Sequence, residues 1–251
     1  MSNRGLNRSP FICVCPTVFG FALHLQYNGR SSVNKQEGTE MKIVVFGATG
    51  NTGKRFVRKA LKEGSEVVVY ARDPEKLLID NENLTVHEGK ITNYQNVYDS
   101  LKGADAVVSL LGRKEAAKGT PLSTGMSHIV NAMQERGISR LVAVTSSDVK
   151  TPQDGTSKRF SLLTTGWKLA KFKGSNENAN AADIIRQSNL DWTLVRVPVL
   201  SDKPSGENAP TAGYPGRHDL KNTLYRQTLV DFLYEQLETS DFSREAPVLS
   251  N

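Results

Sequence analysis

The stretch that decides the fold is residues 42–53, KIVVFGATGNTG. Its first part, 42–46, is a short apolar run rich in β-branched residues, which is typical of a strand buried on both faces of a parallel sheet. Its second part, 47–53, has the form G-x-x-G-x-x-G. Apolar residues then recur at helical spacing over 56–61, and Gly64 supplies the stop signal for a helix. The sequence therefore predicts a strand, a glycine-rich turn and a helix in direct succession.

The pattern continues as regular alternation along the rest of the chain. A second apolar run at 66–70 completes a strand–helix–strand unit within about 30 residues. Further strands are predicted at 84–87, 104–110, 141–145 and 192–197, and further helices at 94–101, 122–136, 179–187 and 224–237. Alternating strands and helices predict a parallel sheet with helices on both faces. We therefore predict an α/β fold, a Rossmann-type doubly wound parallel sheet of order 3-2-1-4-5-6 in a single domain.

The glycine-rich turn is the strongest chemical signal. Glycines let the backbone turn tightly and approach a pyrophosphate, while the N-terminus of the following helix offers free amides and a partial positive charge. A purely structural strand-to-helix turn is the alternative. The strand before the loop and the completed unit after it are the context that a dinucleotide-binding loop requires, so we predict a dinucleotide site.

The end of the second strand indicates which dinucleotide is bound. NAD-binding proteins usually place an acidic residue there for the ribose 2′-hydroxyl, whereas this chain has Arg72. A guanidinium can pair bidentately with a 2′-phosphate, so we predict NADP(H) as the cofactor rather than NAD(H). A solvated surface arginine is the alternative. Asp73 precedes Pro74 and is expected to cap the short helix that follows.

These residues support a family resemblance. Residues 41 to about 250 resemble the atypical short-chain dehydrogenase/reductase superfamily, and most of all its branch of NmrA-like and biliverdin reductase B (flavin reductase)-like NAD(P)H-binding proteins. The stretches that carry the resemblance are KIVVFGATGNTG, VVVYARDPEKL, GADAVVSLLG, HIVNAMQERGISRLVAVTSSDV and DWTLVRVPVLSDKPSG, in this order.

The resemblance implies a set of cofactor-binding residues at the carboxyl ends of the strands. The loop residues would hold the pyrophosphate, Arg72 the 2′-phosphate, Leu111 and Gly112 the adenosine and nicotinamide ribose region, and Thr145, Pro198 and Val199 the nicotinamide. The implied set is Gly47, Thr49, Gly50, Asn51, Thr52, Gly53, Arg72, Leu111, Gly112, Thr145, Pro198 and Val199. The carboxyl ends of the strands are also where open α/β sheets bind their ligands.

One departure from the family pattern shapes the functional prediction. Classical members carry a YxxxK pair whose tyrosine is the general acid. Aligning backward from residues 188–193 places Gly174 and Asn178 at those two positions. Residues 146–190 contain no tyrosine. Hydride transfer is the chemistry of the cofactor, and a conjugated ring can take its proton from water. We therefore predict an NADPH-dependent oxidoreductase that reduces a flavin, quinone or similar acceptor, with Ser146 and Ser147 as catalytic candidates. The alternative is a non-catalytic, NADP(H)-sensing NmrA-like protein.

The first 40 residues differ from the rest. They begin with basic residues, contain both cysteines, Cys13 and Cys15, and include a short, broken apolar run. We interpret 1–40 as a flexible or targeting extension and 41–251 as the NAD(P)-binding domain. Substrate loops are expected near 113–121, 147–175 and 200–222. The sequence favours a cytoplasmic location, with organelle targeting by the extension as the alternative.

Composition limits the partners. The net charge of +6 divides into +2 for residues 1–40 and +4 for the remainder, and a polyanionic cofactor accounts for part of the basicity. We therefore do not expect nucleic acid, and a small conjugated acceptor is the predicted substrate. The basic, aromatic-containing stretch at 158–173 is a candidate surface for binding a protein partner. No uncharged apolar run after Met41 is long enough to span a membrane, and the histidines and cysteines show no metal-binding spacing.

Overall fold

The computed structural model describes residues 12–13, 40–112, 122–156, 175–203, 209–239 and 241–251. The helices in these ranges are α1 (Asn51–Lys62), α2 (Tyr94–Ser100), α4 (Leu122–Arg136), α6 (Ser175–Gln187), α7 (Arg226–Glu238) and the 3-10 helix η1 (Pro74–Lys76). The long strands are β2 (Lys42–Phe46), β3 (Glu66–Ala71), β4 (Leu84–Glu88), β5 (Ala106–Ser109), β6 (Arg140–Ser146) and β7 (Asp191–Val197). Short strands are β1 (Ile12–Cys13), β8 (Val199–Ser201), β9 (Thr211–Gly213), β10 (Thr223–Tyr225) and β11 (Val248–Ser250).

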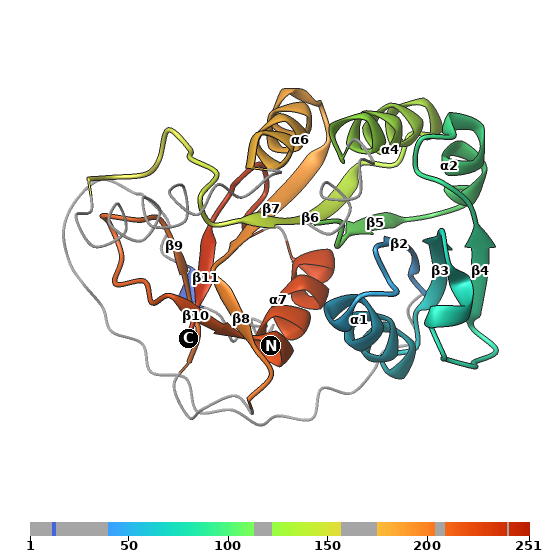
Figure 1. Cartoon of the computed structure of the whole chain (residues 1–251), viewed down its shortest axis with the longest axis horizontal. Helices are drawn as coiled ribbons and strands as arrows, with labels where there is room; N and C mark the ends of the chain where they lie inside the picture. The colour runs from blue at the N-terminus through green and yellow to red at the C-terminus, as the bar shows by residue number, and fades with distance from the viewer. Residues whose placement is uncertain (1–11, 14–39, 113–121, 157–174, 204–208, 240) are drawn as a thin grey trace, which may run out of the picture.

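The main sheet has the predicted order. Strands β4, β3, β2, β5, β6 and β7 lie side by side in that sequence and are all parallel, which is the order 3-2-1-4-5-6. Beyond β7 the sheet continues through β11, which is parallel to β7, and β9, which is antiparallel to β11; β1 pairs with β9. The predicted α/β architecture is therefore confirmed, with an extension at the β7 edge (Figure 1).

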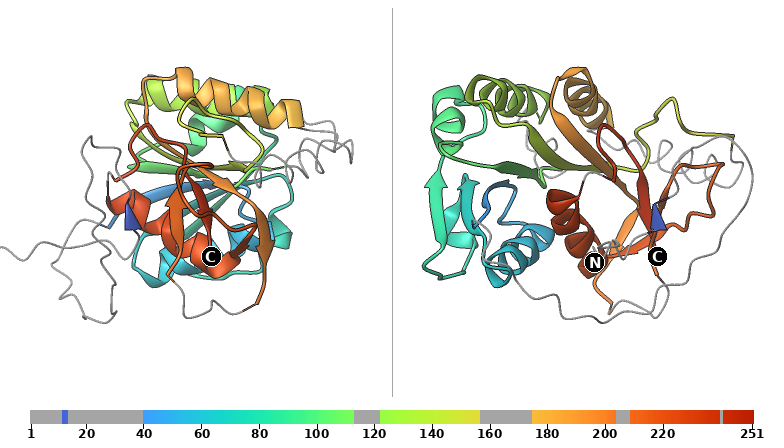
Figure 2. Two further views of the ribbon diagram at one scale, coloured as in Figure 1. Left: turned by 90° about the vertical axis from the view of Figure 1, so that its left-hand side faces the viewer. Right: turned by 180° about the vertical axis from the view of Figure 1, so that it is seen from behind.

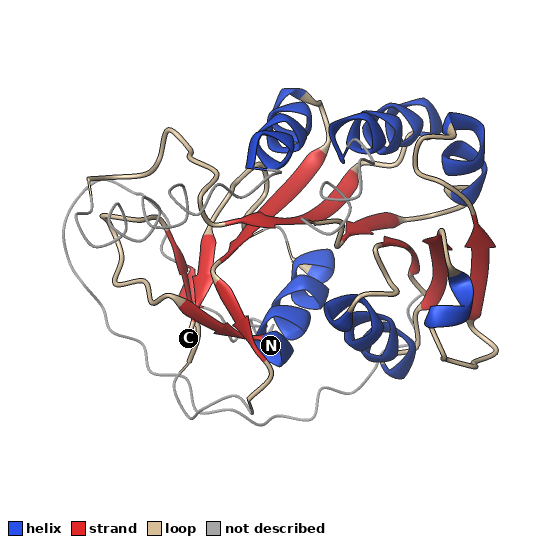
Figure 3. Cartoon of the chain, viewed as in Figure 1, coloured by secondary structure: helices blue, strands red, loops and turns tan. Residues whose placement is uncertain are grey.

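Helices cover both faces of this sheet. Alternate residues of β2 divide between the two cores: Ile43 and Val45 pack on the side of α1 and α7, and Val44 and Phe46 on the side of α2, α4 and α6. The turned views in Figure 2 keep α1 and α7 on one side and α4 and α6 on the other. Colouring by secondary structure shows the helical layers enclosing the strands (Figure 3).

The parallel arrangement determines where a ligand can bind. The carboxyl ends of β2, β5, β6 and β7 meet at one edge of the sheet, and their loops must face one another there. The short strands β8 and β10 pair with each other. In the chain, β8 follows β7 and β10 precedes α7. The segments that follow the strands and the start of α7 therefore surround a common space.

The expected substrate loops are only partly within the described ranges. The loop at 113–121 and most of 147–175 lie outside the described residues. The segment 200–222 is not purely a loop, because 211–213 forms β9 and joins the main sheet. Strands of three residues show too little hydrophobic alternation to be recognised from sequence.

Candidate functional site

The glycine-rich turn is a tightly closed loop between β2 and α1. Gly47 has φ +82°, and a Cβ placed on it would lie 2.7 Å from the carbonyl carbon and oxygen of Leu110. A Cβ on Gly53 would lie 2.3 Å from the carbonyl oxygen of Gly47. Gly50 donates its amide to this same oxygen at 3.3 Å. Only glycine fits at positions 47 and 53, and the sequence motif thus corresponds to real backbone crowding.

The first turn of α1 fits a pyrophosphate. Its N-cap residue is Gly50, no side chain caps the helix, and its first turn contains no acidic residue. The amides and the positive end of the helix dipole therefore remain available to an anion. Thr49 and Asn51 lie in the same loop. These residues fit the phosphates of a dinucleotide.

Arg72 lies at the carboxyl end of β3, where the adenosine ribose of a dinucleotide is expected. Its Nε is 3.6 Å from Oδ2 of Asp73. Asp73 occupies the N-cap position of η1, but its side chain makes no capping hydrogen bond. The carboxylate pairs instead with Lys76 at 2.5 Å, and Lys76 and Arg72 lower its pKa. The expected capping role of the Asp73 side chain is therefore wrong, because two nearby cations attract it more strongly than a backbone amide.

A cavity of about 430 Å³ opens at the carboxyl ends of β5, β6 and β7. It collects predicted residues from four separate segments: Thr52, Leu111, Gly112, Thr145, Ser146, Ser147, Pro198 and Val199. The other predicted residues of the loop, together with Arg72, lie outside its lining. Its volume is within the usual range for small-molecule and cofactor sites.

Of the other lining residues, only Asn178 was named in the sequence, as the residue at the lysine position of the family pattern. Apolar walls come from Leu110, Val144, Val197, Leu200 and Leu229, and polar groups from Asp148, Asn178, Asn222 and Arg226. The apolar members are alternate strand residues or helix residues that resemble ordinary core positions. Asp148, Asn222 and Arg226 come from segments far apart in the chain, so no local motif could have assigned them to one site.

Polar side chains that follow β6 or lie on α6 contribute to the lining of the cavity. Asn178, at the lysine position of the family pattern, is 5% exposed and lines the cavity. Ser146 and Ser147 are half-buried at the end of β6, and the Ser147 amide donates to the carbonyl of Val197 at 3.0 Å. Among the described residues, the buried Oδ1 of Asp148 has no hydrogen-bond partner. These side chains therefore offer hydroxyl, amide and carboxylate groups to a ligand.

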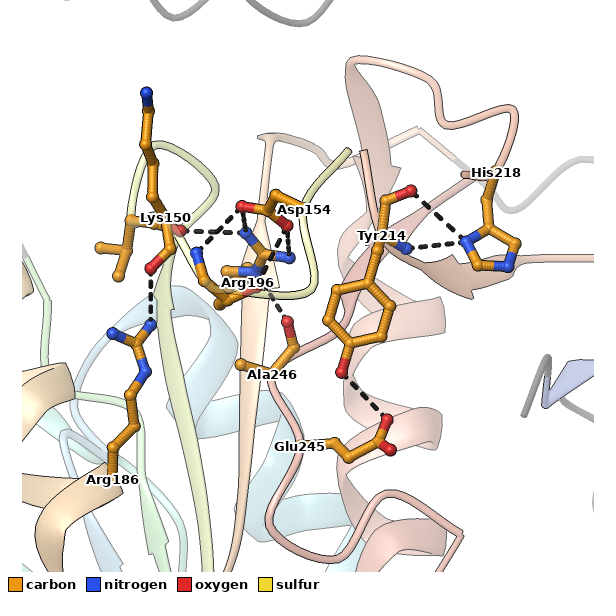
Figure 4. A network of polar contacts seen from close by, with 10 residues as sticks. Lys150, Asp154, Arg186, Arg196, Tyr214, His218, Glu245 and Ala246 are labelled. Atoms are coloured by element: carbon orange, nitrogen blue, oxygen red, sulfur yellow. Dashed lines mark hydrogen bonds and ion pairs between the residues drawn. The ribbon is translucent and has the colours of Figure 1, made fainter. Parts of the chain in front are cut away.

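A buried ion pair fixes the turn that follows Ser147. Arg196 on β7 is fully buried, and it donates to both carboxylate oxygens of Asp154, at 2.8 and 2.7 Å. It also donates to the carbonyls of Val149 at 3.0 Å and Ala246 at 2.7 Å. Figure 4 shows Arg196 between Asp154 and Ala246. Because Val149 directly follows Asp148, the bond to its carbonyl anchors the C-terminal side of the turn that contains Ser147 and Asp148.

Aromatic and acidic side chains close the other side of this network. The ring of Tyr214 lies 5.7 Å from the Arg196 guanidinium, and its hydroxyl donates to Glu245 at 2.9 Å. Burial and the nearby Glu245 raise the pKa of Tyr214 well above its ordinary value. The Tyr214 amide donates to Nδ1 of His218 at 2.9 Å (Figure 4). Tyr214 is thus a neutral packing partner of the arginine.

The described part of the chain contains neither a membrane-spanning helix nor a metal-binding cluster. None of its helices is long and apolar enough to cross a membrane. None of its histidine, cysteine and acidic residues form a cluster of three that could hold a metal ion. His128, an unassigned histidine in α4, contacts the Ile91 carbonyl at 3.0 Å and the edge of the Tyr94 ring, as expected for a packing residue.

The chain is similar in sequence and in fold to known proteins. The family model described as NAD(P)H-binding matches residues 47–240. The Photosystem II assembly factor Ycf39 of Synechocystis sp. is 24% identical over 219 residues, which are 76% of this chain and 59% of that protein. The chain thus spans about three fifths of the length of this relative.

Solved structures share the fold. A short-chain dehydrogenase/reductase from Veillonella parvula DSM 2008, in complex with NADP, superposes with a TM-score of 0.71 at 19% identity, covering 85% of this chain and 95% of that chain. ChuY, an anaerobilin reductase from Escherichia coli O157:H7, superposes with a TM-score of 0.62 at 17% identity, covering 84% and 97%.

Proposed function

The chain belongs to the NAD(P)H-binding family, and we propose that it is an NADPH-dependent reductase that transfers a hydride to a flavin, a quinone or a similar conjugated acceptor. The resemblance to atypical short-chain dehydrogenase/reductases is confirmed by the family match and by the shared fold. The preference for NADPH and the nature of the acceptor are part of the proposal.

The observation that carries the proposal is the composition of the cavity. Its lining combines Thr52 of the phosphate loop with aliphatic side chains that follow β5 or lie in β6, β7, β8 and α7. Aliphatic walls favour a flat ring over a charged, flexible substrate. The tyrosine needed to protonate a carbonyl is absent from residues 146–190. These features together support reduction of a ring that is protonated from water.

The chain's own residues bind and orient the reacting groups. When bound, the dihydronicotinamide supplies the hydride. Pro198 and Val199 would limit the position of the nicotinamide ring from the β7 side, and Leu110 and Leu111 from the β5 side. The aliphatic walls exclude water from the ring faces, and the hydroxyls of Ser146 and Ser147 would hydrogen-bond the polar edge of the acceptor. Holding the two rings about 3–3.5 Å apart is the main catalytic contribution.

The proposal is tested by measuring NADPH oxidation with purified protein under anaerobic conditions. Riboflavin, FMN and menadione serve as acceptors, and NADH replaces NADPH in a parallel series. We expect protein-dependent oxidation of NADPH with at least one acceptor and much slower oxidation of NADH. Saturable binding of NADPH without turnover of any acceptor would contradict the reductase assignment.

A second candidate function is a non-catalytic protein whose interactions depend on bound NADP(H). Two observations favour it: Asn178 stands where the family lysine is expected, and Ycf39 is named an assembly factor. Its test is capture of partners from a source extract by immobilised protein loaded with either NADPH or NADP⁺. A partner retained by only the NADPH-loaded or only the NADP⁺-loaded protein would support this function. Retention of the same partners by both forms would contradict it.

A further inference from the structure

Arg226, the first residue of α7, extends across to the phosphate loop. Its Nη1 donates to Oγ1 of Thr52, in the first turn of α1, at 2.9 Å. Its Nε donates to Oδ1 of Asp202 at 2.8 Å, and its Nη2 contacts Oδ2 of the same residue at 3.4 Å. Both Arg226 and Thr52 line the cavity. These bonds leave other N–H donors of the guanidinium available to a ligand.

The charges around Arg226 do not balance. Asp202 also accepts from Nη2 of Arg55 on α1 at 3.1 Å, so one carboxylate faces two guanidinium groups. The arginines hold the pKa of Asp202 below its ordinary value, with Arg226 contributing most. This trio therefore carries one positive charge in excess next to Thr52. A single anionic group in the cavity would balance it.

The position of Arg226 is unfavourable for helix stability alone. A cation at the N-terminus of a helix opposes the helix dipole, and the first turn of α7 contains no acidic residue. The side chain of Arg226 is only 13% exposed, although it borders an open cavity. A tie between α1 and α7 alone would not require an arginine that lines the cavity.

We propose that Arg226 binds the phosphate on the nicotinamide side of the cofactor's pyrophosphate. The first turn of α1 presents its amides to this phosphate, and Arg226, at the start of α7, reaches the same turn through its hydrogen bond to Thr52. Asp202 and Thr52 orient the guanidinium, and its remaining donors complete the phosphate site. The pyrophosphate is then held between the N-termini of two helices, α1 and α7. This inference rests on the cofactor part of the proposed function and is independent of the acceptor.

Three ligands separate this role from a general effect of charge. NADP⁺ and 2′-phospho-ADP-ribose contain the phosphate in question, whereas 2′,5′-ADP lacks it. Calorimetric titration of each ligand compares the wild type with Arg226→Ala, Arg226→Lys and Arg58→Ala. Arg58 is an exposed cation on α1, and its variant is the matched control for loss of one positive charge. Thermal unfolding of each variant without ligand reports its folding.

We expect Arg226→Ala to weaken NADP⁺ and 2′-phospho-ADP-ribose about tenfold or more. Binding of 2′,5′-ADP should change less than about threefold, and Arg58→Ala should leave all three affinities near those of the wild type. Arg226→Lys should recover part of the loss, because it keeps the charge but not the planar fork. This variant also tests the proposal if the alanine variant is poorly folded.

Three outcomes would overturn the proposal. Equal weakening of all three ligands would assign Arg226 a general structural or electrostatic role. Weakening of NADP⁺ alone would place Arg226 on the nicotinamide rather than on the phosphate. Unchanged affinities in a folded Arg226→Ala protein would show that Arg226 serves only to link α7 to α1. Failure of the wild type to bind NADP⁺ would instead contradict the proposed function itself.

Discussion

Replacement of Gly53 by alanine tests whether the crowding of the phosphate loop is required for cofactor binding. The new Cβ would lie 2.3 Å from the Gly47 carbonyl oxygen and 2.5 Å from the Ala48 Cα. Ordinary contact begins near 3.4 Å, so the loop and the helix must separate by about 1 Å. The obstructing atoms are backbone, and no flexible side chain can move aside to make room.

The size of the effect follows from this displacement. Overpacking of this kind costs about 1–3 kcal/mol, which lowers the melting temperature by roughly 2–12 °C in a domain of this size. A shift of about 1 Å also moves the amides away from the pyrophosphate. We therefore expect the Kd for NADPH to rise about tenfold or more.

Gly50→Ala is the matched control in the same loop. Its Cβ would lie 3.5 Å from the Gly47 oxygen, and the backbone at Gly50, with φ −75°, is open to any residue. Its melting temperature should stay within about 2 °C of the wild type. Thermal unfolding and NADPH titration are measured on both variants. A Gly53→Ala protein with unchanged stability and affinity, or equal destabilisation by both substitutions, would refute this reasoning.

Three further substitutions test other parts of the site. Arg72→Ala should weaken NADPH about tenfold or more while leaving NADH nearly unchanged, and equal losses in the two titrations would reject the 2′-phosphate role. Asp154→Ala leaves the buried Arg196 without its charged partner, so we expect a loss of about 3–5 kcal/mol in chemical denaturation; a loss below about 1 kcal/mol would contradict the buried-pair account. Asp148→Asn should lower kcat/KM for riboflavin, which has a ring N–H, about tenfold more than for menadione, which has none. Equal losses for both acceptors would show that Asp148 does not contact the acceptor.

The sheet and the phosphate loop could be predicted from the sequence because their signals are local. Residues 42–53 contain the strand, the glycines and the helix start in one uninterrupted stretch. The order 3-2-1-4-5-6 is the usual one for a Rossmann-type dinucleotide-binding sheet, and the alternation predicted the covered parallel sheet. The strand β11 was missed because it has three residues and lies at the end of the chain.

The polar groups of the cavity could not be found in this way. Arg226 approaches Thr52 across 174 positions of sequence, and Arg196 pairs with Asp154 across 42. In the sequence, Arg226 is one of 32 basic residues. Its role depends on the packing of α7 beside α1, which only the folded chain determines. For Asp73 the N-cap position was predicted correctly, but its side chain pairs with Lys76 instead of capping the helix. The position of a residue at a helix start therefore does not determine the partner of its side chain.

In the proposed reaction, the bound cofactor passes its hydride to a conjugated ring within this cavity. The most direct test is a single-turnover experiment in which protein loaded with NADPH is mixed anaerobically with riboflavin, and both absorbances are followed. We predict that one flavin is reduced for each NADPH oxidised, and that deuterium at the transferred position of NADPH slows both signals equally. Saturated NADPH that leaves the flavin oxidised at the rate of the protein-free mixture would contradict the claim.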